Sequence, residues 1–374
     1  MSGLPVSRSP WILGVLAGLV ACGLAIWMAR PLVRLGFVAA EFPKPPGPYS
    51  VSSADIEVPL PAPGGAGDAK VPVSVWYPVA TAVGGAAAKP LPFLLYAPMW
   101  GGSRNDNVAL MQTFASHGFV VAAFDDIARD PPALDASPAD QAARLMPFDI
   151  SSEASRLVFL EGASKRAALQ AAKASALLTA FAKAPSLLPA GAQLDPNRIG
   201  MIGASFGGAA AAETAQRDKR IRAAVNLDGW VYGEAAARTM RVPFAEFNST
   251  RGAAVFSVIS SRLPQRQFID DIDAREFAIV KRTLDERAGS IDVTIASAVH
   301  SDFNDELYSD SRWKRWRPWR GMMLNPARMR IITDAYVVAF FNAHLNGTTE
   351  PLLRQATSPF PEVTIKLGRQ GKPE

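Results

Sequence analysis

The stretch IGMIGASFGGAAAAETA, residues 199–215, joins an apolar run, a glycine-containing turn and an alanine-rich segment. The apolar run predicts a buried strand, and the alanines that follow it predict a helix. Between them lies Gly203-Ala204-Ser205-Phe206-Gly207, a G-x-S-x-G pattern in which small residues allow a sharp turn that projects the serine hydroxyl. The stretch therefore predicts an α/β fold and a candidate nucleophile, Ser205. The alternative is a glycine-rich turn without chemistry.

A serine hydroxyl needs a general base within hydrogen-bond reach, and the chain offers three histidines. His117 comes in the last turn of a predicted helix, where an imidazole can interact with the last carbonyl groups, and His344, also just before a predicted helix end, is interpreted as a capping or packing residue. His300 instead follows the apolar run DVTIASAV and opens the polar loop SDFND. We therefore expect His300 to be the base, at the sheet edge that also carries Ser205.

The imidazole in turn needs a carboxylate that fixes its tautomer. The run AVNLDGW, residues 224–230, places Asp228 at the end of the strand predicted after the serine helix, which is the same sheet edge. The next apolar run, AAVFSVISSRLPQ, holds no carboxylate, and we interpret Asp270 and Asp271 as capping residues at the start of a later helix. Asp228 is thus the expected acid, in the chain order serine, aspartate, histidine that this kind of fold uses. The alternative for Asp228 is an ordinary turn aspartate.

Short apolar runs alternate with helical patterns from Tyr49 onward, which is typical of an α/β fold with right-handed crossovers. Eight strands are predicted, at residues 54–60, 71–78, 92–98, 118–125, 198–205, 221–228, 253–260 and 291–300. Helices are predicted near residues 106–116, 155–184, 207–217, 271–288 and 328–345. From the third strand onward the runs are continuously apolar, as expected of parallel strands covered by helices on both faces, while the first two alternate and suit an antiparallel edge.

The phrases GASFGG, NLDGW and SAVHSDFND resemble the serine esterases related to platelet-activating-factor acetylhydrolase, in the dienelactone-hydrolase-like group of α/β-hydrolases. The segment LPFLLYAPMWGGSRNDNVALMQTFASHGFVVAAFDD adds to this resemblance, which covers about residues 49–345. It implies an α/β-hydrolase fold with a mostly parallel eight-stranded sheet, and acyl transfer from an ester to water through an acyl-serine. One departure is Pro98-Met99, where the family usually has His-Gly.

The resemblance also implies an oxyanion hole of two backbone N–H groups, from Phe206 and from Trp100. Losing one such donor can cost roughly 3 to 4 kcal/mol. We expect Trp230 and Phe303 to line an apolar substrate pocket, with core packing as the alternative. The expected substrate is an ester with short or oxidised acyl chains, of the phospholipid type. Two other functions stay open: a catalytically silent α/β-hydrolase with a binding or envelope-structural role, and a peptidase of the same fold.

Composition argues against several classes of protein. The net charge of +5 is modest for 374 residues, so a nucleic-acid-binding surface is poorly supported. A single cysteine, Cys22, excludes an intrachain disulfide and a cysteine-cluster metal site, and three histidines make a histidine-rich metal centre a poor hypothesis. We expect no metal and no cofactor. The sequence does not predict an oligomeric state.

The N-terminal segment differs in composition from the rest. Residues 11–29 carry no charge and match the roughly 20 residues that a membrane-spanning helix needs. We interpret residues 1–34 as a signal anchor, with a lipoprotein signal ending at Cys22 as the second choice and a cleaved secretory signal as the third. A Pro-rich linker at 35–48, a catalytic domain at 49–365 and a polar tail at 366–374 complete the predicted organisation. The expected location is membrane-anchored and extracytoplasmic.

The segment RWKRWRPWR, Arg312–Arg320, interleaves basic and aromatic side chains. Tryptophans beside cations suit an anionic membrane interface. The alternative is a solvated loop whose arginines pair with nearby acids. Both interpretations stay open, and the first would give the protein a second membrane contact.

Overall fold

A computed structural model describes residues 42–63, 67–79, 90–149, 151–250, 266–308 and 324–369. Within these ranges nine strands form one sheet in the order β1-β2-β4-β3-β5-β6-β7-β8-β9. The six strands from β4 to β8 in this order are mutually parallel, whereas β1 and β2 on one side and β9 on the other are antiparallel to their neighbours.

The strands are β1 Val51–Pro61, β2 Asp68–Pro78, β3 Leu91–Ala97, β4 Val120–Phe124, β5 Leu194–Ala204, β6 Ile221–Leu227, β7 Phe244–Ser249, β8 Ile291–Ile295 and β9 Val363–Leu367. The α-helices are α2 Val108–Ser116, α3 Pro138–Leu145, α4 Glu153–Lys183, α5 Phe206–Arg217, α6 Gly233–Ala237, α8 Arg266–Glu286 and α10 Pro326–Phe341. Short 3₁₀ turns lie at Ile127–Arg129, Pro132–Leu134, Pro185–Leu187, His300–Phe303, Asp305–Tyr308 and Pro351–Leu353, and a π turn at Asn342–Asn346 follows α10.

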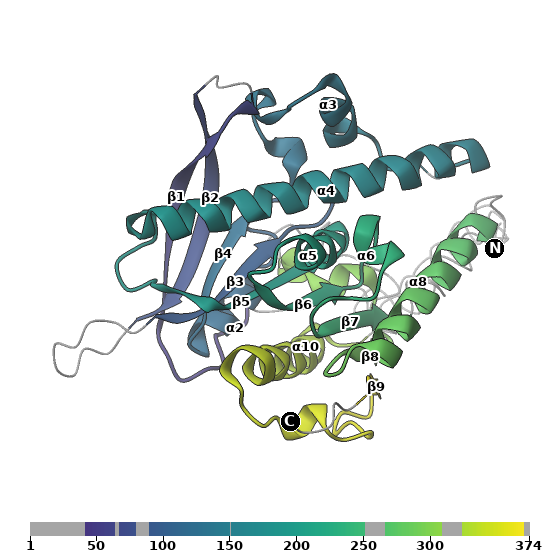
Figure 1. Ribbon diagram of the computed structural model, residues 1–374. Coiled ribbons are helices and arrows are strands. Elements are labelled where there is room, and N and C mark those ends of the chain that lie inside the picture. Colours follow the sequence, from purple (N-terminus) through teal and green to yellow (C-terminus); the bar gives the residue numbers. More distant parts are fainter. Residues whose placement is uncertain are drawn as a thin grey trace, which may run out of the picture.

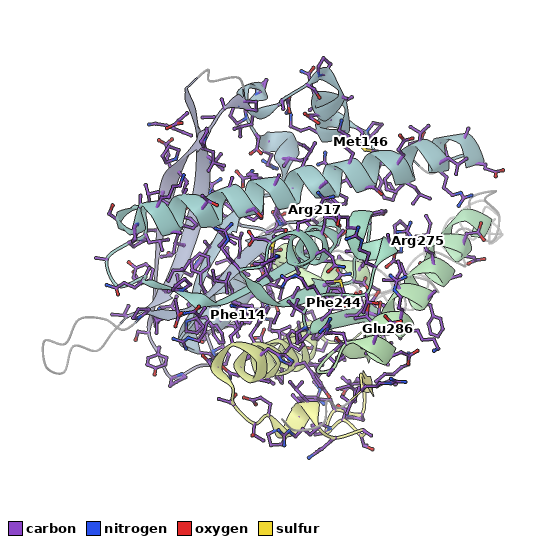
Figure 2. All side chains as sticks on the ribbon, viewed as in Figure 1. Phe114, Met146, Arg217, Phe244, Arg275 and Glu286 are labelled. Atoms are coloured by element: carbon purple, nitrogen blue, oxygen red, sulfur yellow. The ribbon has the colours of Figure 1, made fainter. Side chains whose placement is uncertain are left out.

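Helices cover both faces of the sheet, because its central strands are apolar on both sides (Figure 1). On one face α2 and α10 pack against the strands in a core that contains Phe114. On the other face α4, α5 and α6 form a second core, which contains Phe244 (Figure 2). This is the three-layer arrangement of the predicted α/β-hydrolase fold, with the carboxyl ends of the parallel strands at one edge.

Seven of the eight predicted strands lie within the described residues and are found there, and two further strands join the same sheet. β7 at Phe244–Ser249 and β9 were not expected, and β9 runs across the predicted start of a polar tail at residue 366. The strand predicted at 253–260 lies outside the described residues. Helix α8 begins at Arg266, so Asp270 and Asp271 lie inside it rather than at its start.

The five predicted helices are found, with ends shifted by a few residues. No helix within the described ranges is both long enough and apolar enough to cross a bilayer. The segments predicted to contact a membrane, residues 11–29 and Arg312–Arg320, lie outside those ranges.

Candidate active site

Ser205 lies on the sharp turn between β5 and α5. Its backbone is in an unusual conformation for a residue other than glycine, with φ of 54° and ψ of −124°. The turn requires glycine at position 207, because a Cβ atom there would collide with the carbonyl oxygens of Ala97 and Pro98, at the end of β3. The glycine pattern seen in the sequence therefore reflects close packing of two backbone segments, which places Ser205 at the sheet edge.

Asp228 follows β6 and also has a positive φ, 59°. The turn that it occupies is held from both sides by Asn226, whose Oδ1 accepts from the Gly229 N–H at 3.0 Å and whose Nδ2 donates to the Gly229 carbonyl at 2.6 Å. The Asp228 N–H donates to the carbonyl of Phe247 on β7 at 2.8 Å. These bonds keep the carboxylate at the sheet edge despite the unfavourable backbone conformation.

His300 joins the other two side chains into one hydrogen-bonded chain. Its Nε2 lies 2.9 Å from Ser205 Oγ, and its Nδ1 lies 2.8 Å from Asp228 Oδ2. With a neutral imidazole, the serine hydroxyl donates to Nε2 and the Nδ1–H donates to the carboxylate. Burial opposes the charged imidazolium, but the hydrogen bond and the charge of Asp228 outweigh it and raise the pKa of His300 above its usual value of 6.5.

The other two histidines lie elsewhere. His117 caps the end of α2, with Nδ1 2.8 Å from the carbonyl oxygen of Thr113. His344 lies in the π turn, where its Nε2 is 3.1 Å from the carbonyl oxygen of Gly289 and burial lowers its pKa. His117 therefore interacts with the last carbonyls of its own helix, as the sequence predicted, whereas the carbonyl that His344 contacts belongs to a residue 55 positions away in sequence.

The loop that carries His300 is anchored on the start of α2. Asn107 Nδ2 donates to the carbonyl of Phe303 at 2.7 Å, and Asp305 Oδ2 accepts from the Ala109 N–H at 2.9 Å. These contacts draw Phe303 into the core, where it is 3% exposed, and it does not line the cavity beside Ser205. The expectation that Phe303 forms part of the substrate pocket is therefore corrected.

A cavity of about 540 Å³ opens beside Ser205 and His300. Its apolar wall consists of the aromatic residues Trp100, Phe148, Phe206, Trp230, Tyr232 and Phe277. Several of these rings contact one another: Trp100 and Phe206 have centroids 4.8 Å apart, and Phe148 stacks on Trp230 at 6.3 Å. Trp230, expected from the sequence to line a substrate pocket, is thus among the residues of this aromatic wall.

Acidic side chains also line the cavity, which the sequence did not predict. It is lined by Glu246, Asp273, Glu276 and Asp292, together with Lys366, whose Nζ lies 2.9 Å from Asp292 Oδ2. Burial raises the pKa of Glu276 to about 7 and that of Glu246 well above its usual value. The only sequence signal was a lone carboxylate inside the short apolar run FAEF.

Phe206 and Trp100, the expected oxyanion residues, pack together beside the nucleophile. Phe206 is the first residue of α5, where a backbone N–H has no partner within the helix. Arg166 of α4 lies behind both rings, with its guanidinium carbon 4.3 Å from the Trp100 centroid and 5.5 Å from the Phe206 centroid. Arg166 is completely buried and pairs with Asp126, also completely buried, after β4. This pair was not predicted from the sequence.

The described residues contain no group of three or more histidine, cysteine or acidic side chains that could hold a metal ion. The groups that converge on the cavity mouth are instead a hydroxyl, an imidazole and a carboxylate. Such an arrangement can transfer a proton from the serine and stabilise the positive imidazole that results.

The family model for platelet-activating factor acetylhydrolase, isoform II, matches residues 190–346, which include Ser205, Asp228 and His300. The chain has the α/β-hydrolase fold, and over these residues it resembles these acetylhydrolases. A ferulic acid esterase from Streptomyces cinnamoneus has a similar structure, with a TM-score of 0.59 and 23% sequence identity over 88% of this chain and 99% of that one. No curated protein sequence gives a significant match. The expected resemblance and fold class are confirmed, and the match to the acetylhydrolase model supports a carboxylic-ester hydrolase.

Proposed function

We propose that this protein is a serine-dependent carboxylic-ester hydrolase that works through an acyl-serine intermediate. The observation that carries the proposal is the continuous hydrogen-bond chain from Ser205 through His300 to Asp228. The match to the acetylhydrolase model over the same residues gives independent support.

In the first half-reaction, His300 Nε2 accepts the hydroxyl proton of Ser205 while Oγ attacks the ester carbonyl carbon. Asp228 stabilises the imidazolium that forms and holds its Nδ1–H toward the carboxylate. The imidazolium then gives its Nε2 proton to the departing alkoxide, which leaves as the alcohol. Water then attacks the acyl carbon while His300 accepts a proton from it. The imidazolium returns that proton to Ser205 Oγ as the C–Oγ bond breaks, which releases the carboxylic acid and restores the serine.

The negative charge on the tetrahedral intermediate is stabilised by the backbone N–H groups of Phe206 and Trp100. The position of Phe206 at the first residue of α5 supports this role, because N–H groups at a helix start point toward bound anions. Trp100 is supported by its place in the turn after β3 and by its ring contact with Phe206.

The proposed substrate is an ester whose acyl group is apolar and short to medium in length. It is either an ester of the phospholipid type or an ester whose acyl group contains an aromatic ring. The aromatic wall of the cavity and its volume of about 540 Å³ support an apolar group of this size. The fold shared with a ferulic acid esterase is a reason to include aromatic acyl groups among the substrates tested.

The decisive experiment measures hydrolysis of p-nitrophenyl acetate, butyrate and octanoate and of a ferulate ester by the full chain in mild detergent. Ser205→Ala, His300→Ala and Asp228→Asn are measured beside the wild type, and we expect each to lose on the order of 10²-fold to 10⁴-fold or more in kcat. Labelling by a fluorophosphonate probe should occur in the wild type and be absent from Ser205→Ala. A folded wild type that neither hydrolyses esters nor takes up the probe would refute the proposal in favour of a silent hydrolase.

We also propose that the protein is tethered to a membrane on its extracytoplasmic side. The support is the uncharged apolar stretch at residues 11–29 followed by the Pro-rich segment. Fractionation of cells before and after deletion of residues 1–34 tests this, because the deletion should move the protein from the membrane to the soluble fraction. Recovery of the intact chain in the soluble fraction would refute it.

A further inference from the structure

Ser249, the last residue of β7, binds the side chain of Asp228 with two donors. Its backbone N–H donates to Oδ1 at 2.7 Å, and its hydroxyl donates to Oδ2 at 2.9 Å. One residue therefore gives a hydrogen bond to each oxygen of the same carboxylate. Such paired donors fix the plane of a carboxylate, whose terminal torsion is otherwise broad.

The hydroxyl bond is the one placed to influence His300. Asp228 Oδ2 accepts from both Ser249 Oγ and His300 Nδ1, at 2.9 and 2.8 Å. If the carboxylate rotated, Oδ2 would leave the line of the Nδ1–H, and the imidazole would lose the partner that orients Nε2 toward Ser205. The geometry of the Ser205–His300 contact thus depends on the hydrogen bond between Ser249 Oγ and Asp228 Oδ2.

The next residue ties the same strand end to the histidine loop. Thr250 Oγ1 accepts from the Ser297 N–H at 3.0 Å, and Ser249 pairs with Ile295 in the register of β7 and β8. Ser297 has a positive φ of 64° and lies in the turn that leads to His300. The end of β7 therefore contacts both the carboxylate and the segment that carries the imidazole.

We propose that Ser249 is a positioning residue, which orients the Asp228 carboxylate through its side-chain hydroxyl and thereby holds His300 in line with Ser205. This inference rests on the proposed esterase function. In this role Ser249 does not react with the substrate, although the residue lines the cavity.

The test compares Ser249→Ala, Ser249→Thr and Ser290→Ala in the full chain, with p-nitrophenyl butyrate as the substrate and thermal unfolding measured for each variant. Ser290 is the matched control, because it is a buried serine at the opposite end of β7, where its Oγ accepts from the Phe244 N–H at 3.1 Å. We expect Ser249→Ala to lower kcat about tenfold with KM unchanged, since a hydrogen bond to a charged group is lost while the backbone N–H bond remains. Ser249→Thr, which keeps the hydroxyl, should recover most of kcat, and Ser290→Ala should leave kcat unchanged.

Three results would overturn the proposal. They are a Ser249→Ala variant with wild-type kcat, a change confined to KM, and equal losses in the alanine and threonine variants at unchanged thermal stability. A change confined to KM would mean that the Ser249 side chain contacts substrate instead. The proposed function fails separately, if Ser205→Ala remains as active as the wild type.

Discussion

Replacing Arg166 by methionine should strongly destabilise the protein. Arg166 and Asp126 are both completely buried and form an ion pair, and Arg166 also donates to the backbone carbonyls of Ala143 and Arg144. Methionine preserves much of the apolar stem that packs beside Trp100 but removes every donor. Asp126 then keeps the hydrogen bond from the Ala128 N–H at 2.8 Å but is a buried charge without its counter-ion.

The expected loss follows from that uncompensated charge. Breaking a buried ion pair by removing one partner costs about 3 to 5 kcal/mol. Because a domain is typically stable by only about 5 to 15 kcal/mol, this is a large share of the total. At roughly 2 to 4 °C for each kcal/mol in a large domain, Tm should fall by about 10 °C. The pair is shielded from solvent, so added salt should not change the difference.

The assay is thermal unfolding of the wild type, Arg166→Met and the double variant Arg166→Met/Asp126→Asn. Asparagine keeps the shape of Asp126 and an oxygen that can accept from Ala128 while it removes the charge. The double variant should therefore regain at least half of the lost Tm. The reasoning is refuted if the single variant loses less than about 1 kcal/mol, or if the double variant is no more stable than the single one.

Three further outcomes are expected. Ester hydrolysis needs a neutral His300, and Asp228 raises the pKa of that histidine, so kcat/KM should rise with pH through the raised pKa and level off above it. In Asp228→Asn the midpoint of the residual activity should move to lower pH, and an unchanged midpoint would contradict this. Gly207→Ala should lower kcat at least about 100-fold, because its Cβ would push the serine turn away from the carbonyls at the end of β3, and kinetics on folded protein would detect this. Phe148→Ala should raise KM for p-nitrophenyl octanoate about tenfold but leave KM for the acetate nearly unchanged, because this ring lines the cavity. Tm should fall little, because the side chain is 52% exposed. Equal KM changes for the two esters would argue against an acyl-binding role.

Most of the fold could be predicted because its central strands are continuously apolar. β7 was missed because Glu246 interrupts its run, and such a residue argues against a buried strand unless a partner is known. The partner, Asn226 Nδ2 at 2.9 to 3.0 Å from the two carboxylate oxygens, lies on β6 and is 20 positions away in sequence. β9 was missed because Val363–Leu367 is short and alternates with polar residues near the end of a polar segment.

The three residues at the centre of the candidate site could be proposed from local patterns, since each follows an apolar run that ends at the same sheet edge. Their supporting contacts could not, because these join residues from separate elements. Nothing around Ser249 in the sequence suggests that both of its donors bind Asp228, and nothing around Arg166 indicates a buried partner after β4. Phe303 was misplaced for a similar reason: closeness to His300 in sequence says nothing of the 3₁₀ turn that directs its ring into the core.

The position of β9 has a consequence for how the protein is made. β9 pairs with β8 along five residues of each strand, and the end of β8 leads to His300. A ribosome adding about 5 to 20 residues per second completes the Ser205 turn on the order of ten seconds before it completes β9. Throughout that interval the nascent chain has a nucleophile turn beside a sheet that still lacks its final strand. The strand that pairs with β8, the element leading to His300, is therefore the last of the nine to be synthesised.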